Sequence, residues 1–326
     1  MDTYYKGKKI LICGGAGFIG SHMVDAFVRL NADVTVVDPC FPAAGGHESY
    51  LAGSASHVKW VKEPIQEFTS LDAVLSCSDV VIDAMGFTRH HEGMENPGLD
   101  FELNYLPHLT LIQALNRFPK PAIYLGSRGQ YGKLQGSVNE DYPQIPNDPQ
   151  GIHKSAAESM FRIYSKKFNW PCLSFRIGNC FGPRQPLSGR DVGLISGFIR
   201  SILLDEVVEI YGEEGRCRNL IYIDDLVDIM MMVIPQVATG FKSLNIMGEP
   251  IVLKSVLDHL ISQTGTGNYV FMPFPEEIAA LDPGQAVISN EEMCQYINDY
   301  QYSSLEHALN ETINYSKMVL KNDMAL

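Results

Sequence analysis

A short apolar segment followed by three regularly spaced glycines limits the fold of this chain more than any other feature of its sequence. Residues 10–13 are apolar, Gly14, Gly17 and Gly20 follow, and apolar residues with helical spacing continue to Leu30. In such a strand–turn–helix unit the first glycine permits a tight turn and the second lets the backbone approach a pyrophosphate. The third lets the helix pack closely against the strand. The segment therefore predicts a dinucleotide-binding turn at the start of an α/β domain.

The end of the next expected strand supports the same site. Residues 33–37 are mainly apolar and β-branched, and Asp38 follows them. A carboxylate at this place accepts hydrogen bonds from the hydroxyls of an adenosine ribose and repels a 2′-phosphate. We therefore expect NAD, rather than NADP, as the cofactor.

Strand and helix patterns alternate through the first half of the chain, which predicts a parallel sheet covered on both faces. Pro107 lies inside one helical segment and should kink it near Asn104, because an interior proline removes a backbone hydrogen bond. The expected strands are residues 10–13, 33–37, 58–61, 79–82, 122–125 and 172–177, and the expected helices are 18–30, 71–77, 96–118 and 152–167.

The pattern loosens after residue 183, where helical segments at 194–204, 252–264 and 303–320 mix with short strands. We predict a Rossmann-type doubly wound parallel sheet with a smaller C-terminal mixed α/β substrate domain over the ends of its strands. The cofactor domain would comprise residues 1–176 and about 215–245. The substrate domain would comprise residues 177–214 and 246–326.

Charge and cysteine content exclude several classes of function. The net charge of −13 argues against a nucleic-acid partner, because phosphate contacts need a basic surface. The seven cysteines form no CxxC pair and have no zinc-type spacing, so we expect no metal site, reduced thiols and a cytoplasmic protein. The most apolar late stretch, residues 229–234, is too short to cross a membrane.

Six further segments, in order, make the chain similar to the extended short-chain dehydrogenase/reductase family, the NAD-dependent epimerases and dehydratases. Most members of that family act on nucleotide-linked sugars, so the resemblance implies an NAD-dependent enzyme with a nucleotide-sugar substrate. The segments are residues 79–86, Asn104 with its helix, Ser127–Gly132, Arg176–Pro183, Arg218–Asp225 and Leu244–Gly248.

The resemblance also implies roles for individual residues. Ser127 would hydrogen-bond to the substrate oxygen, and Lys154 would hold the nicotinamide ribose. The implied cofactor-binding residues are Gly14, Ala16, Gly17, Phe18, Ile19, Gly20, Asp38, Met85, Gly86, Asn104, Lys154 and Ile177. The implied substrate-binding residues are Asn179, Arg184, Arg190, Tyr211 and Arg218, since a guanidinium can donate two parallel hydrogen bonds to a phosphate.

One residue departs from the family pattern at the centre of the site. The family has a tyrosine four residues before its lysine, and this chain has Gln150, whose amide does not titrate usefully. Three explanations remain open. In the first, His90 or His91, in the expected loop 86–91, supplies the acid/base group, because histidine titrates near neutral pH. Alternatively Ser127, water or the substrate relays the proton in a slow reaction, or the chain is a catalytically impaired binding protein with a regulatory or scaffolding role.

Two further expectations follow from the resemblance. Dehydratases of the family typically carry an Asp-Glu pair directly after the active serine, whereas Ser127 is followed by Arg128 and Gly129. A 4,6-dehydratase is therefore disfavoured, and an epimerase, a dehydrogenase or a ketoreductase remains. Family dimers pair the helices that correspond to residues 96–118 and 152–167, so we expect a homodimer.

Overall fold

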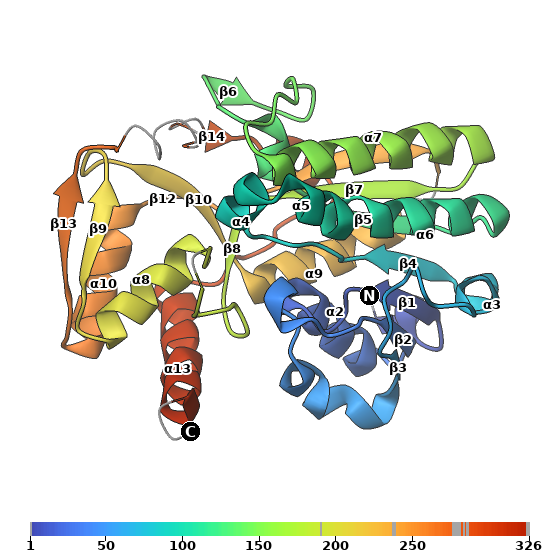
Figure 1. Ribbon diagram of the computed structural model, residues 1–326, viewed down its shortest axis with the longest axis horizontal. Coiled ribbons are helices and arrows are strands. Elements are labelled where there is room, and N and C mark those ends of the chain that lie inside the picture. Colours follow the sequence, from blue (N-terminus) through green and yellow to red (C-terminus); the bar gives the residue numbers. More distant parts are fainter. Residues whose placement is uncertain are drawn as a thin grey trace.

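A computed structural model describes residues 2–189, 191–236, 239–275, 282, 284 and 287–323. Its centre is a seven-stranded sheet in the order β11-β7-β5-β4-β1-β2-β3, in which every neighbouring pair is parallel (Figure 1). The strands are β1 (Lys9–Cys13), β2 (Asp33–Val37), β3 (Val58–Val61), β4 (Val80–Asp83), β5 (Ala122–Ser127), β7 (Cys172–Ile177) and β11 (Phe241–Ile246). The predicted α/β class and doubly wound parallel sheet are confirmed.

Alternate residues of the strands fill two separate hydrophobic layers. Ile10 and Ile12 of β1 belong to one buried cluster, whereas Leu11 and Cys13 belong to the other. Because successive side chains of a strand point to opposite faces, each face needs its own cover of helices. The first layer contains α2 (Phe18–Arg29) and α9 (Ile223–Val233), and the second contains α3 (Leu71–Cys77), α6 (Leu106–Arg117) and α7 (Pro149–Phe168).

The segment around Pro107 forms two helices rather than the single kinked helix that we expected. Helix α5 (Pro97–Asn104) ends before Tyr105, whose φ of −131° breaks the helical geometry, and α6 begins at Leu106. Pro107 thereby lies in the first turn of α6, where its missing N–H costs no hydrogen bond. The break leaves Asn104 at the end of a helix, where its side chain reaches the loop after β4.

The smaller sheets lie beside the carboxyl ends of the central strands (Figure 1). Strand β10 (Cys217–Tyr222) pairs with β8 (Asn179–Phe181) and β12 (Pro250–Val252). Strand β9 (Val207–Tyr211) pairs with β13 (Asn268–Met272), and β6 (Ser137–Val138) pairs with β14 (Val287–Ile288). The other helices are α1 (Asp2–Tyr5), α4 (His90–Glu95), α8 (Leu194–Leu203), α10 (Leu253–Thr264), α12 (Glu291–Cys294) and α13 (Leu305–Asp323). The 3-10 helices are η1 (Pro42–Ala44), η2 (Glu48–His57), η3 (Arg128–Tyr131) and η4 (Ile234–Gln236).

Candidate active site

The glycine turn between β1 and α2 has room for a ligand and none for larger residues. Gly14 has a φ of +86°, and a Cβ there would lie 2.6 Å from the carbonyl carbon of Ala84. A Cβ on Gly20 would lie 2.1 Å from the Gly14 carbonyl oxygen, so this position also excludes any side chain. At Gly17 the nearest atom would be 3.5 Å away, and the helix N-terminus that begins at Phe18 is available to a pyrophosphate. The turn therefore fits the phosphates of a dinucleotide.

Asp38 follows β2 and lies beside this turn, where backbone hydrogen bonds orient its carboxylate. Its two oxygens accept hydrogen bonds from the backbone N–H groups of Ala16, at 2.8 Å, and Cys40, at 2.7 Å. Burial raises the pKa of the Asp38 carboxyl, and these two hydrogen bonds oppose the increase. Because each carboxylate oxygen accepts more than one hydrogen bond, Asp38 can also accept from ribose hydroxyls.

Lys154 lies in a buried position at the carboxyl ends of β4 and β5. Its Nζ donates to the backbone oxygens of Met85, at 2.8 Å, and Leu125, at 3.1 Å. A Cβ added to Gly86 would lie 3.2 Å from this Nζ, so the absence of a side chain at that position makes room for the lysine. Burial lowers the pKa of Lys154 to about 8. The structure thereby brings together Met85, Gly86 and Lys154.

Gln150 fills the tyrosine position and acts as a hydrogen-bond donor within the protein. Its Nε2 donates to the backbone oxygen of Phe87 at 3.3 Å, and its side chain is buried. Asn104 also binds the backbone of Phe87. Its Oδ1 accepts from the Phe87 N–H at 2.7 Å, and its Nδ2 donates to the Phe87 oxygen at 2.8 Å. These bonds fix the loop between β4 and α4 against the start of α7.

Ser127 ends β5 and begins η3. Its hydroxyl oxygen accepts from the Gly129 N–H at 3.1 Å, and the Gln130 side chain accepts from the Ser127 N–H at 2.8 Å. This capping box orients the serine, whose hydroxyl proton stays available to a ligand. Ile177 lies opposite Ser127 in the register of β5 and β7, so it is at the same edge of the sheet.

His90 and His91 begin helix α4 rather than lying in a loop as expected, because Asp191 accepts hydrogen bonds from the backbone N–H groups at the start of that helix. The Nδ1 atom of His90 lies 2.9 Å from an oxygen of Asp148, and the Nε2 atom of His91 lies 3.9 Å from an oxygen of Asp191. The two rings therefore have different carboxylate partners.

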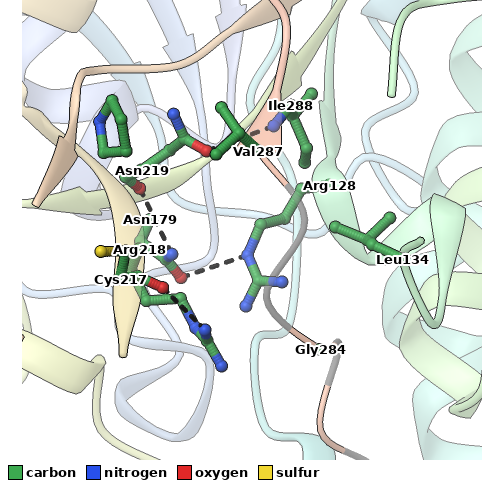
Figure 2. Close-up of a pocket in the computed structure, with 10 residues that line it drawn as sticks. Arg128, Leu134, Asn179, Cys217, Arg218, Asn219, Gly284, Val287 and Ile288 are labelled. Atoms are coloured by element: carbon green, nitrogen blue, oxygen red, sulfur yellow. Dashed lines mark hydrogen bonds between the residues drawn. The ribbon is translucent and has the colours of Figure 1, made fainter. Parts of the chain in front are cut away.

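Arg128, which directly follows Ser127 in the chain, and Arg218 line one pocket, the arginine pocket (Figure 2). Arg128 Nε donates to the Asn179 Oδ1 at 3.2 Å, and burial lowers the pKa of this guanidinium. Arg218 donates to the carboxylate of Asp282 at 3.0 Å, and Arg216 binds the same oxygen. Burial, together with the charge of Arg216, lowers the pKa of Arg218 to about 10. Arg216 and Arg218 share the Asp282 carboxylate, and Arg128 interacts electrostatically with both Asp282 and Asp148. These guanidiniums are suited to donate hydrogen bonds to a diphosphate.

The other expected substrate residues lie differently. Tyr211 borders this cluster, because its backbone oxygen accepts from Arg216 and its hydroxyl donates to Glu209 at 2.8 Å. Arg184 instead forms a 2.6 Å ion pair with Asp25 on α2 and is not among the residues that line the arginine pocket. Arg190 lies outside the described residues.

A buried carboxylate–imidazole pair lies behind Lys154 and was not expected from the sequence. The Nδ1 atom of His108 lies 2.7 Å from an oxygen of Asp83, and both side chains are buried. Burial lowers the pKa of His108, and its Nε2 has no hydrogen-bond partner among the described residues. The charge of Asp83 also acts on Lys154, where it opposes the lowering of that lysine's pKa. The only signal in the sequence was an aspartate at the end of a strand with a helical histidine 25 positions later.

Sequence reasoning also missed the pairing of His90 with Asp148, the place of Arg128 in the pocket and the pairing of Arg216 with Asp282. An arginine directly after the expected active serine was a usable signal for Arg128. Among the described residues, no group of three or more His, Cys, Asp or Glu side chains could hold a metal ion. No helix in the described part of the chain combines the length and apolarity that a membrane crossing requires.

Comparison with known proteins identifies the family. The NAD dependent epimerase/dehydratase family matches residues 10–246. This chain belongs to that family. NAD is its cofactor, as the glycine turn, Asp38 and Lys154 indicated, and the expected resemblance is confirmed.

Two curated relatives illustrate the range of the family. A putative UDP-glucose 4-epimerase of Methanocaldococcus jannaschii is 28% identical over 69% of this chain and 73% of its own length. A UDP-N-acetyl-alpha-D-glucosaminuronate decarboxylase of Bacillus cytotoxicus is 26% identical over 97% of this chain and 99% of its own. Among solved structures, UDP-glucuronic acid 4-epimerase from Bacillus cereus, in complex with UDP-glucuronic acid and NAD, has a TM-score of 0.84 at 24% identity. The structural alignment covers 95% of this chain and 99% of the epimerase chain. The relatives are enzymes of nucleotide-sugar chemistry, and this chain is an enzyme of the same family.

Proposed function

We propose that this chain catalyses an NAD-dependent redox change at a hydroxyl-bearing carbon of a nucleoside-diphosphate sugar. The carrying observation is that the glycine turn and the arginine pocket flank Ser127 and Lys154. A dinucleotide bound at the turn would extend toward Lys154, and a diphosphate bound at the arginines would extend toward Ser127. The sugar would then lie between the two, at the carboxyl ends of β4 and β5, where ligands bind in open α/β sheets.

Each part of the site would have its own role in binding or catalysis. The amides of the glycine turn would bind the pyrophosphate of NAD, and Asp38 would bind the adenosine ribose. Lys154 would exchange its two carbonyl partners for hydroxyls of the second ribose, and Ser127 would hydrogen-bond to the reacting oxygen. When bound, NAD supplies a reversible hydride acceptor.

The arginine pocket supports a diphosphate-linked substrate. Arg128 and Arg218 flank Asn179, and Asp282 neutralises only part of the charge of the cluster. A diphosphate would bind these guanidiniums by displacing the Asp282 carboxylate, since phosphate oxygens accept bidentate hydrogen bonds. Arg128 and Gly129 at the positions of the dehydratase Asp-Glu pair favour an epimerase, a dehydrogenase or a ketoreductase.

The test is binding followed by turnover with two probes, UDP-glucose and UDP-glucuronate. Calorimetry should show that NAD binds the purified chain, and chromatography should show conversion of at least one probe. Lys154→Met should lose NAD affinity, whereas Lys166→Met, on an exposed turn of the same helix, should behave as the wild type. Binding of NAD and a probe without any conversion would instead favour the catalytically impaired binding protein.

We also propose that the chain is a cytoplasmic homodimer. Ile152 and Ile163 on α7 are about half exposed, and Phe101 on α5 is 39% exposed, so this face carries apolar surface that a second copy could cover. All seven cysteines are free thiols, which supports a reducing compartment. Sedimentation of the wild type and of Ile163→Lys tests the dimer, because the charged variant should shift toward the monomer.

A further inference from the structure

We propose that His90, oriented by Asp148, is the acid/base group that exchanges the substrate hydroxyl proton in place of the missing tyrosine. The inference rests on the proposed function, because it assigns a group to the proton that accompanies hydride transfer. It names one of the two histidines that the sequence left as alternatives.

The contact between the two side chains determines which nitrogen can accept a proton. The Asp148 carboxylate accepts from Nδ1 of His90 at 2.9 Å, so Nδ1 carries the ring proton and Nε2 is the acceptor. Burial disfavours the charged form of Asp148, but the hydrogen bonds from His90 and the Gly151 N–H and the charges of His90 and Arg128 together outweigh it, so the pKa of this carboxyl lies below its usual value. Asp148 is therefore ionised at neutral pH and stabilises an imidazolium when one forms.

Asp148 is held at the N-terminus of α7, two residues before Gln150. Its other oxygen accepts from the Gly151 N–H at 2.7 Å, which fixes the carboxylate in place. Its side chain is only 11% exposed, whereas the imidazole of His90 is 46% exposed. The fixed carboxylate therefore orients the His90 ring, and the ring remains accessible to a substrate.

Two contacts bring this pair to the expected position of the sugar. Gln150 and Asn104 clamp Phe87, three residues before His90, so the segment that leads to the histidine is fixed on α7. The turn after Ser127 packs on the same end of α7, because a Cβ on Gly151 would lie 2.6 Å from the Gly129 oxygen. His90, through Asp148, and the Ser127 turn, through Gly151, therefore both contact the first turn of α7.

The neighbouring histidines are directed elsewhere. His91 lies against Asp191, which also caps the backbone of α4. His153 is 15% exposed and its Nδ1 lies 2.5 Å from Asp100, a buried residue that also accepts from Asn104. His153 thereby belongs to the group that supports the Phe87 clamp.

The proposed step balances protons and electrons. The substrate O–H bond breaks and its proton moves to Nε2, while the hydride of the same carbon passes to the oxidised nicotinamide and a carbonyl forms. The imidazolium lies beside the Asp148 carboxylate, and the reverse step returns both proton and hydride. The other charged groups nearby are the Arg89–Glu92 pair on the same segment, Asp191 at the start of α4, and Arg128 on the far side of Asp148.

The kinetic test compares His90→Gln with His91→Gln, which changes the adjacent histidine on the same helix. His90→Gln should reduce kcat by about 10²- to 10⁴-fold with little change in NAD affinity, and His91→Gln should not. Asp148→Asn keeps a residue that caps helices well, so it should fold but lose activity by disturbing the tautomer. Added imidazole should restore part of the activity of His90→Gly, which a structural role would not allow.

A second readout does not depend on turnover. Nitrogen NMR of the labelled wild type should show His90 protonated at Nδ1, and Asp148→Asn should shift its ring toward the Nε2-protonated tautomer. A wild-type His90 ring protonated at Nε2, or a tautomer ratio unchanged by Asp148→Asn, would overturn the assignment.

The outcomes separate this inference from the proposed function. Wild-type turnover that His90→Gln retains would overturn the role of His90 and leave the redox function standing. A wild type that binds NAD and both probes but converts neither would overturn the redox function itself, and the role of His90 with it.

Discussion

Replacement of Lys154 by methionine should change how the stability of the NAD-free protein depends on pH. The lysine is 5% exposed, and burial lowers its pKa from 10.5 to about 8 in the folded chain. Unfolding returns the side chain to water and to its ordinary pKa. Between the two values the unfolded chain binds more protons, so the free energy of unfolding increases as the pH rises from 8 to 10.5.

The size of the effect follows from the two pKa values. A single group with this shift adds about 1 kcal/mol to the stability of the wild type between pH 7 and pH 9, and about 2–3 kcal/mol between pH 7 and pH 10. Below pH 8 the contribution is nearly constant, because the lysine is protonated in both states. Methionine has no such group, so Lys154→Met should lack this increase.

Urea unfolding at pH 7 and pH 9, followed by circular dichroism, measures the difference between wild type and Lys154→Met. Lys166→Met is the matched control, because this exposed lysine should leave the pH dependence unchanged. Parallel pH profiles of the wild type and Lys154→Met would refute the claim that the buried ammonium is destabilising. Adding NAD at 100 times its dissociation constant should stabilise the wild type by about 2.7 kcal/mol and the variant by less.

Three further changes test other parts of the structure. Arg176→Met should lower the free energy of unfolding in urea by about 3–5 kcal/mol, because it leaves the buried Glu158 carboxylate without its bidentate partner; a loss below 1 kcal/mol would contradict this. Gly20→Ala should abolish NAD binding in calorimetry, whereas Gly53→Ala, with no atom within 4 Å of the added Cβ, should bind NAD normally. Arg218→Ala should weaken binding of UDP-glucose or UDP-glucuronate about 10- to 150-fold through loss of charged hydrogen bonds, and unchanged affinity would remove Arg218 from the substrate site.

Local patterns were sufficient for the cofactor half of the protein. The apolar runs and the glycine spacing predicted the strands, their parallel arrangement and the turn at Gly14, because these depend on contacts within a few residues or on repeated β–α units. The break near Asn104 was also foreseeable from Pro107. That it separates two helices, rather than bending one, depended on the geometry of Tyr105.

Distant contacts decided the roles of the polar residues. His90 contacts Asp148, 58 positions along the chain. Arg184 pairs with Asp25, 159 positions away, and does not line the arginine pocket. No spacing rule in one sequence relates such residues, since their separation depends on how several elements pack together. The sequence alone thus determined the sheet and the glycine turn, and it raised the question of Gln150. Only the tertiary structure decided which carboxylate each histidine contacts and which arginines converge, because side-chain charges act through space and over a few ångströms.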